Sequence, residues 1–364
     1  MPVISEQVFL SGYTTLRLGG PATRFVQAQT DAEVVAAVRE ADLRGEPVLV
    51  LGGGSNLVIA DDGFPGTAIR VMTRGVTACD AGERVRVAVA AGENWDQFVE
   101  WAVTEKLAGV ECLAGIPGLA GATPIQNVGA YGQEVSATIG SVTVFDRAQP
   151  RTATLAASAC GFGYRTSVFK TVAWPAFAPS PTGRYVVLAA TFELARDPMS
   201  APIRYAELAR HLGVAVGDQA PLADVRDAVL DLRRGKGMVL DPADPDTASA
   251  GSFFTNPVLD HDQLAALERA ASARSPGTAV PTFPAEGGQV KVPAAWLIEQ
   301  AGFGKGFPGS GPARISAKHT LALTNHGGCG TAELIGLARQ IVTVVRTVFG
   351  VELTTEPVLV GVRL

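Results

Sequence analysis

Two glycine-rich segments have the residue types and the spacing to bind a ligand through the backbone. The first, residues 51–57, reads Leu-Gly-Gly-Gly-Ser-Asn-Leu and follows a short apolar run. Consecutive small residues can turn the chain and direct several backbone N–H groups at one anion, as phosphate-binding nests do. The segment has neither the Gly-Lys-Ser/Thr of a P-loop nor the GxGxxG of a Rossmann dinucleotide fold. A plain turn at the end of a strand explains three glycines equally well.

The second segment, residues 115–132, is longer and interleaves polar side chains with its glycines. It contains five glycines and two prolines, together with Gln126, Asn127 and Tyr131. This composition allows the backbone to approach a flat, hydrogen-bonding ligand closely. A structural Ω-loop is the alternative.

Regular elements surround the two segments and must position them. Apolar periodicity predicts a helix at 31–43, with Thr30 or Asp31 as N-cap, and a buried strand at 47–51 that leads into the first segment. Further strands are predicted at 67–72, 85–90, 139–145 and 185–194, and a helix at 95–105. The second half favours helices at 222–234 and 332–349, the latter capped by Thr331 and Gly350, and strands at 351–353 and 358–362. The pattern is that of an α+β or α/β protein.

The composition excludes several classes of protein. The chain has 364 residues, of which 47% are hydrophobic and 18% charged, so it is globular rather than disordered. Its net charge of −5 argues against a nucleic-acid partner. The four cysteines show no CxxC spacing and no histidine has metal-ligand spacing, so no metal is expected. No apolar run is long enough for a membrane span, and we expect a cytoplasmic monomer.

The two segments, in this order, resemble those of the UDP-N-acetylenolpyruvoylglucosamine reductase (MurB) family, type I. The similarity continues at residues 14–20, 163–167 (Gly-Tyr-Arg-Thr-Ser), 251–257 (Gly-Ser-Phe-Phe-Thr-Asn-Pro) and 356–357 (Glu-Pro). The resemblance implies a vanillyl-alcohol-oxidase-like (PCMH-type), two-lobed FAD-binding domain and an α+β substrate-binding domain. With the border at the proline-marked stretch 195–202, these are residues 1–200 (lobes 1–74 and 75–200) and 201–349, followed by a C-terminal strand segment, 350–364.

The resemblance also assigns the residues that hold FAD. They are Gly52, Gly53, Gly54, Ser55, Asn56 and Leu57 in the first segment and Pro117, Gly118, Gly121, Ala122, Thr123, Gln126, Asn127, Gly129, Ala130 and Tyr131 in the second. Ala122 stands where the family often has glycine, which is acceptable if its φ is negative.

The family's reaction belongs to peptidoglycan synthesis, and hence to cell-wall biogenesis, cell shape and division. It implies that NADPH reduces FAD and leaves, after which the enolpyruvyl ether of UDP-N-acetylglucosamine binds and becomes UDP-N-acetylmuramate. Hydride addition to the CH₂ carbon places negative charge on the adjoining carbon and its carboxylate, which Arg165 can pair bidentately. Glu356 matches the catalytic glutamate and is expected to hold or share a proton, while Ser252 supplies the final proton. Without this context, surface ion pairs and a Gly-Ser turn explain the three residues better.

Four further residues match substrate contacts of the family. Tyr205 can stack on the nucleotide, Lys236 can bind the diphosphate, and Asn256 and His319 are further contacts, His319 where some members have Gln. For Lys236 the alternative is a solvated helix end, and for His319 a core or surface histidine. Two other functions remain open: a different FAD oxidoreductase of the same fold, such as a sugar-acid oxidase, or a non-catalytic nucleotide-sugar-binding protein.

Overall fold

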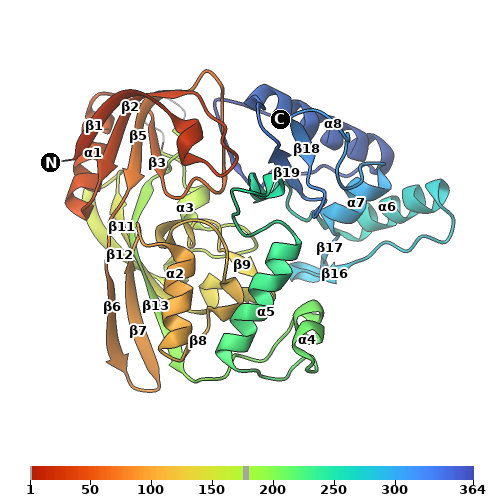
Figure 1. The fold of residues 1–364 in the computed structure, drawn as a ribbon, viewed down its shortest axis with the longest axis horizontal. Coiled ribbons are helices and arrows are strands. Elements are labelled where there is room, and N and C mark those ends of the chain that lie inside the picture. Colours follow the sequence, from red (N-terminus) through yellow and green to blue (C-terminus); the bar gives the residue numbers. More distant parts are fainter. Residues whose placement is uncertain (1, 175–179) are drawn as a thin grey trace. The chain divides into compact units, whose positions relative to one another are not determined.

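The chain folds into two compact units, and each is described by itself. The computed structural model describes residues 2–174 and 180–364 (Figure 1). The first unit contains Met1–Phe9, Pro21–Gly54 and Gly63–Val239, and the second contains Leu10–Gly20, Ser55–Asp62 and Leu240–Leu364. The main passage from one unit to the other therefore follows Val239, whereas the sequence predicts a border at 200/201.

Two helices that follow residue 200 pack into the first unit. Helices α4 (Ala206–Leu212) and α5 (Leu222–Gly235) bury Leu208 and Val229 in the same apolar cluster as Phe192. The proline-marked stretch is a turn inside this unit, where the Ser200 N–H donates to the Ala220 carbonyl. Proline and polar residues mark a turn and a domain linker alike, so composition alone cannot distinguish the two.

A small sheet in the first unit leads into the first glycine segment. Its strand order is β1-β2-β5-β3, with β2, β5 and β3 parallel and β1 antiparallel. The strands span Val3–Phe9 (β1), Pro21–Ala28 (β2), Phe64–Val71 (β5) and Val48–Leu51 (β3). Helix α1 (Asp31–Leu43) packs on this sheet and is capped by the Thr30 side chain, which accepts from the Glu33 N–H. The predicted helix, its Thr30 cap and the strand before the loop are confirmed.

A larger antiparallel sheet supports the second glycine segment. Within the described residues its order is β12-β11-β13-β7-β6, and β8 also pairs with β13 (Figure 1). The strands are Arg151–Ala156 (β12), Ile139–Asp146 (β11), Tyr185–Arg196 (β13), Arg84–Ala90 (β7), Val76–Ala81 (β6) and Leu107–Ala108 (β8). Trp95 and Phe98 of helix α2 (Trp95–Thr104) pack against Phe192, with ring centroids 5.7 and 5.2 Å away. The helix and the strands expected here are confirmed to within a few residues.

The second unit consists of short sheets and three helices within the described residues. One sheet has the order β14-β19-β18, another β15-β17-β16, and β20 pairs with β4 in parallel. The strands are Leu57–Ile59 (β4), Ser249–Ser252 (β14), Val258–Leu259 (β15), Phe283–Pro284 (β16), Val290–Lys291 (β17), Ala313–Ile315 (β18), Ala322–Asn325 (β19) and Val358–Val360 (β20). The helices are His261–Arg274 (α6), Ala294–Gln300 (α7) and Thr331–Phe349 (α8).

Two expectations about the C-terminal part are wrong. Thr331 is the first residue of α8 and not its N-cap, which is Gly330. The Asp61 carboxylate, distant in sequence, accepts the N–H groups of Thr331 and Ala332 at 2.8 and 3.1 Å and satisfies this helix end. Residues 351–353 form no strand, because Val351 and Leu353 are buried in the core without a neighbouring strand to pair with. The expected Gly350 cap and the strand at 358–360 are confirmed.

The remaining elements are short. In the first unit they include α3 (Val168–Thr171) and the hairpin of β9 (Gly129–Ala130) and β10 (Gln133–Glu134). Single turns of 3₁₀ helix are Leu10–Tyr13 (η1), Glu111–Leu113 (η2), Ala120–Ala122 (η3), Val135–Ala137 (η4), Ala157–Ala159 (η5), Pro245–Thr247 (η6) and Glu286–Gly288 (η7).

Candidate functional site

The two glycine segments meet in the first unit, backbone against backbone. A Cβ added to Gly53 would lie 2.7 Å from the Cα of Gly118. Gly54 and Gly118 have φ values of +63° and +132°, which side chains rarely adopt. The Gly118 carbonyl accepts from the Trp95 N–H at 3.1 Å, so the second segment is also fixed to the start of α2. Gly53 and Gly118 are therefore required by the close approach of the two segments to each other.

Further along, the second segment is held against the large sheet. The Gly121 N–H donates to the Ala91 carbonyl at 3.0 Å, and a Cβ at Gly121 would lie 2.4 Å from that of Ala91. Ala122 lies in η3 and is not among the residues with positive φ. The condition on which alanine is acceptable at this position is therefore met.

The Asn127 side chain shapes the segment. Its Nδ2 donates to Glu134 Oε2 at 2.8 Å and to the Gly163 carbonyl at 3.0 Å, and its Oδ1 accepts from the Ser136 N–H at 3.1 Å. Asn127 itself has a φ of +44°, a left-handed conformation that asparagine tolerates better than most residues. These contacts join the second segment to the turn at Gly163 that precedes Arg165.

Arg165 is anchored to the second segment. Its Nη2 donates to the Gly129 carbonyl at 2.8 Å and its Nη1 to the Asn127 carbonyl at 3.4 Å, while its own φ is +54°. Nearby, Lys170 Nζ donates to Gln126 Oε1 at 2.9 Å. The first unit thus brings the predicted catalytic arginine together with predicted cofactor residues. The sequence prediction missed Glu134 and Lys170, since only the fold shows their partners.

A second group in the first unit combines two tyrosines with charged side chains. The Tyr131 and Tyr205 rings meet edge to face, with centroids 5.4 Å apart, and Lys236 Nζ lies 5.5 Å from the Tyr131 ring centroid. Lys236 also pairs with Glu207 Oε2 at 2.5 Å. Burial lowers the pKa of the neighbouring Arg233 guanidinium to about 10 and raises the pKa of Tyr131 to about 12. Tyr131, Tyr205 and Lys236 are brought together, and the sequence prediction missed Glu207 and Arg233.

In the second unit, backbone pairing brings the segments of Ser252 and Glu356 together. Ser252 ends β14 opposite Ala322, and the Glu356 N–H donates at 2.9 Å to the carbonyl of Phe253, the residue after Ser252. Asn56 joins them, because its Nδ2 donates to the Glu356 carbonyl at 3.4 Å and its own carbonyl accepts from the Val358 N–H at 3.0 Å. The Ser252 and Glu356 side chains are both half-buried. Backbone pairing thus brings together the segments that carry these two predicted residues.

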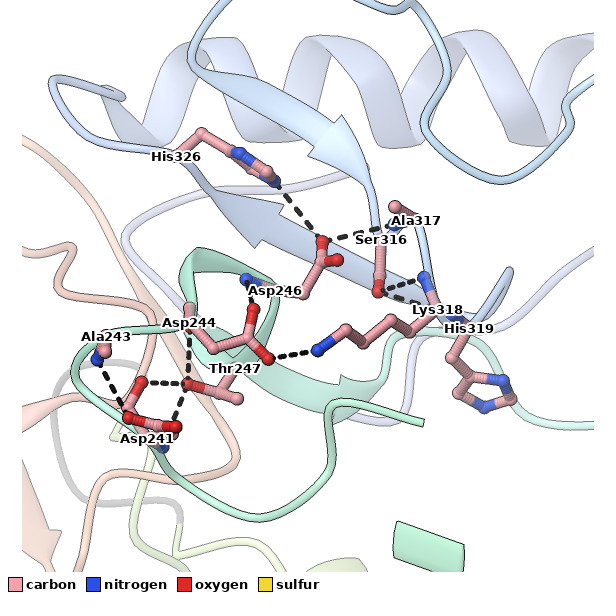
Figure 2. A network of polar contacts seen from close by, with 10 residues as sticks. All are labelled: Asp241, Ala243, Asp244, Asp246, Thr247, Ser316, Ala317, Lys318, His319 and His326. Atoms are coloured by element: carbon pink, nitrogen blue, oxygen red, sulfur yellow. Dashed lines mark hydrogen bonds and ion pairs between the residues drawn. The ribbon is translucent and has the colours of Figure 1, made fainter. Parts of the chain in front are cut away.

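Asn256 and His319 lie on other parts of the same unit. The Asn256 Oδ1 accepts the N–H of Ala294, the first residue of α7, at 2.9 Å. Figure 2 shows His319 on a turn in which Ser316 Oγ accepts the N–H groups of Lys318 and His319 at 3.0 and 3.2 Å. Asn256 thus holds the start of α7, and Ser316 holds the backbone of His319.

Two carboxylates that follow Val239 in the sequence, those of Asp244 and Asp246, hold the turn that carries His319. Lys318 Nζ lies 2.5 Å from Asp244 Oδ2, which holds the pKa of that carboxyl below its ordinary value and raises the pKa of Lys318 (Figure 2). Asp246 Oδ1 accepts from the Ala317 N–H at 3.1 Å and lies 3.4 Å from His326 Nε2. Asp244 and Asp246 were not predicted from the sequence, since nothing local marks their partners more than 70 residues away.

The described residues contain no cluster suited to a metal ion and no helix suited to a membrane span. No group of three or more His, Cys, Asp or Glu side chains within residues 2–174 and 180–364 could hold a metal ion. In that same part of the chain, no helix has the length and apolar character needed to cross a bilayer.

Comparison with known proteins relates the whole chain to one group of enzymes. Residues 242–360 match the family model described as the UDP-N-acetylenolpyruvoylglucosamine reductase C-terminal domain, and residues 22–153 match an FAD binding domain. A UDP-N-acetylenolpyruvoylglucosamine reductase of Thermobifida fusca is 57% identical over 362 residues, covering 99% of both chains. This chain belongs to the UDP-N-acetylenolpyruvoylglucosamine reductase family.

Other members of the reductase family agree with this relation. The reductase of Streptomyces coelicolor is 57% identical over 358 residues, which are 98% of this chain and 90% of that one. The crystal structure of the Thermus caldophilus reductase matches with a TM-score of 0.64 at 24% identity, covering 99% of this chain and all of that one, and so shares the fold. The resemblance stated from the sequence motifs is therefore confirmed, as is a mixed α and β chain with an FAD-binding domain before a reductase C-terminal domain.

Proposed function

We propose that this chain reduces UDP-N-acetylenolpyruvoylglucosamine to UDP-N-acetylmuramate for peptidoglycan synthesis, with FAD as cofactor and NADPH as reductant. The flavin-dependent reduction follows from membership of the family. The observation in the structure that best supports the site assignment is the bond from Arg165 to the carbonyls of Asn127 and Gly129, because it links the proposed catalytic arginine to the proposed flavin loop.

The contact between the two glycine segments supports their assignment to the cofactor. Gly53 and Gly118 touch through their backbones, where a Cβ at Gly53 would come within 2.7 Å of Gly118, so the two predicted cofactor segments lie together. We assign FAD to residues 52–57 and to the predicted contacts between Pro117 and Tyr131. When bound there, FAD would supply the hydride for the substrate's CH₂ carbon. The role of the chain is to hold the cofactor and the substrate in register and to manage charge and protons.

Arg165 would stabilise the negative charge that develops on the substrate. Hydride addition leaves charge on the carbon next to the carboxylate, and a guanidinium pairs with a carboxylate through two parallel hydrogen bonds. The two carbonyls of the second segment already fix the direction of the Arg165 side chain. A donor oriented before the reaction stabilises such charge without a cost of reorganisation during it.

Ser252 and Glu356 would complete the reaction by moving a proton. Ser252 would donate its hydroxyl proton to the carbon that carries the charge. Glu356 would hold or share a proton, so that its carboxyl group adds no negative charge beside that carbon. The backbone pairing of the two segments through Phe253 and Glu356 supports this assignment. Within the same unit, the Asn56 side chain also donates to the Glu356 backbone carbonyl.

The substrate residues would recognise the nucleotide and the sugar. Tyr205, which is 44% exposed, offers a ring face for the uracil, and Lys236 offers a cation for the diphosphate. Asn256 and His319 would make further polar contacts. We further propose a monomer in the cytoplasm, which agrees with four unpaired cysteines in the described residues. We also propose that the FAD-binding domain precedes the substrate-binding domain, with Tyr205 and Lys236 contributed by the first unit.

Anaerobic stopped-flow absorbance of the purified flavoprotein tests this proposal. NADPH is expected to bleach the flavin absorbance, and the enolpyruvyl nucleotide added afterwards is expected to restore it. UDP-N-acetylglucosamine, which has no enolpyruvyl group, is the control and should not restore it. A flavin that NADPH reduces but the enolpyruvyl nucleotide does not reoxidise would contradict the proposed substrate.

A further inference from the structure

Glu207 forms an ion pair with Lys236, the cation that the proposed function assigns to the substrate's diphosphate. Its Oε2 lies 2.5 Å from Lys236 Nζ, and the two side chains are 36% and 31% exposed. Glu207 lies in the first turn of α4, two residues after Tyr205, and Lys236 caps the C-terminal end of α5. The two helices pack together, so the ion pair joins them close to Tyr205, the residue before α4.

The surroundings of this pair are suited to an anion larger than one carboxylate. The Lys236 ammonium lies 5.5 Å from the Tyr131 ring centroid, and the Tyr131 ring meets that of Tyr205. The Arg233 guanidinium, next to Tyr131, donates through Nη2 to the Met238 carbonyl at 2.9 Å, and its Nε is buried without a hydrogen-bond partner. Since the pKa of Arg233 is about 10, it remains charged at neutral pH. The Lys236 ammonium is therefore shared by the Glu207 carboxylate and the Tyr131 ring, and the Arg233 cation lies beside the same ring.

We infer that Glu207 is an internal counter-anion, which holds Lys236 over the Tyr131 ring until the diphosphate of the nucleotide replaces it. This inference rests on the proposed function, since it concerns the same diphosphate contact. A half-exposed ion pair is weak, so a diphosphate with more charge can displace it. Because the diphosphate must displace Glu207, substrate and product both bind more weakly. The chemical step is unaffected, and release of the product is favoured.

The inference predicts that removal of the carboxylate tightens diphosphate binding. Isothermal titration calorimetry of the oxidised, flavin-loaded protein would measure the dissociation constants of UDP and of uridine. Glu207→Gln is expected to lower the dissociation constant for UDP about two- to five-fold and to leave that for uridine unchanged. Glu105→Gln, which removes an exposed carboxylate at the end of α2, is the matched control for net charge and should change neither value.

A double-mutant cycle connects the effect to Lys236. In a Lys236→Gln background, UDP is expected to bind about ten-fold more weakly or worse than in the wild type, and adding Glu207→Gln should no longer tighten it. Weaker or unchanged UDP binding in Glu207→Gln would overturn the inference, because the carboxylate would then support the ligand or be irrelevant to it. A wild-type protein that binds no UDP would overturn the proposed function as well, whereas wild-type binding without the gain would overturn the inference alone.

Discussion

The two units hold their proposed site residues by different means. In the first unit, Gly53 and Gly118 approach backbone to backbone, and Asn127 and Arg165 adopt left-handed conformations. In the second unit, Ser252 ends a strand, and a backbone hydrogen bond from Glu356 to Phe253 brings the two segments together. The first unit thus depends on the shape of its backbone, and the second presents side chains from an ordinary strand arrangement. A substitution should therefore impair cofactor binding in the first unit and proton transfer in the second.

Two ion pairs, one in each unit, differ in how deeply they are buried. Arg147 in the first unit has a side chain only 1% exposed, which donates to both carboxylate oxygens of Asp42 and to the carbonyls of Thr182 and Gly183. The Lys318 and Asp244 side chains of the second unit are 39% and 22% exposed. Since a buried charge without a partner is costly, the first pair should be the more important for stability.

The largest effect is expected from Glu356→Gln, which removes a proton-holding group but keeps its size. Reoxidation of the reduced flavin by the enolpyruvyl nucleotide should slow about 10²- to 10⁴-fold. Flavin content and flavin reduction by NADPH should stay normal. Anaerobic stopped-flow absorbance measures both half-reactions. Equal slowing of flavin reduction and flavin reoxidation would contradict the assignment of proton transfer to the second unit.

Next in size is the loss of the Asp42 partner from the buried Arg147. Asp42→Ala is expected to lower the free energy of unfolding by about 3–5 kcal/mol, because the guanidinium would lose its counter-charge inside the protein. Asp244→Ala in the second unit should lower it by at most about 1 kcal/mol, as is usual for exposed pairs. Denaturant titrations followed by circular dichroism and flavin fluorescence measure these changes. Similar losses in the two variants would contradict the contrast in burial.

A smaller effect is expected from Gly53→Ala, which adds a Cβ where the two glycine segments touch. The clash with Gly118 should cost about 1–3 kcal/mol, and so weaken FAD binding by about 5- to 150-fold. Gly336→Ala is the matched control, since nothing lies within 4 Å of its added Cβ inside α8. It should keep FAD affinity and add about 1 kcal/mol of stability through helix propensity. Wild-type FAD affinity in Gly53→Ala, measured by fluorescence titration of the apoprotein, would argue against the loop assignment.

The smallest effect is expected in the reactivity of the four cysteine thiols, none of which has a role in the proposed function. Cys79 is exposed on β6, whereas burial raises the pKa of Cys160 and of Cys329 to about 11 and also raises the pKa of Cys112. At pH 8 only about 0.1% of a thiol with a pKa of 11 is ionised, and the thiolate is the reactive form. Iodoacetamide at pH 8 should therefore modify Cys79 first, as peptide mass spectrometry can show. Equally fast modification of Cys329 would mean that the second unit opens there.

Sequence patterns predicted the parts of the fold that depend on local order. The apolar periodicity of α1, its Thr30 cap and the strand before the first glycine segment need no distant partner, and all three are confirmed. The N-cap of α8 is Gly330 and not the predicted Thr331. The helix needs no side-chain cap of its own, because Asp61, far away in the sequence, accepts its first N–H groups. Val351 and Leu353 alternate as a strand would, yet they fill the core without a pairing strand.

The candidate site divides in the same way. The motifs marked Arg165, Ser252 and Glu356 through the family resemblance, but they did not show what holds these residues. Glu134, Glu207 and Asp244 act on partners that only the folded chain brings near: Asn127, Lys236 and Lys318. An acidic residue in a polar stretch looks the same whether it is solvated or paired, so such roles are not readable from sequence.

The most direct measurement of the proposed division between the units is a single-turnover experiment on Ser252→Ala. The variant removes one hydroxyl from the end of β14 and changes nothing in the first unit. We predict wild-type FAD content, wild-type bleaching of the flavin by NADPH, and reoxidation by the enolpyruvyl nucleotide that is at least about 100-fold slower. Near-normal reoxidation, or a loss of flavin reduction together with it, would contradict the assignment of proton transfer to the second unit.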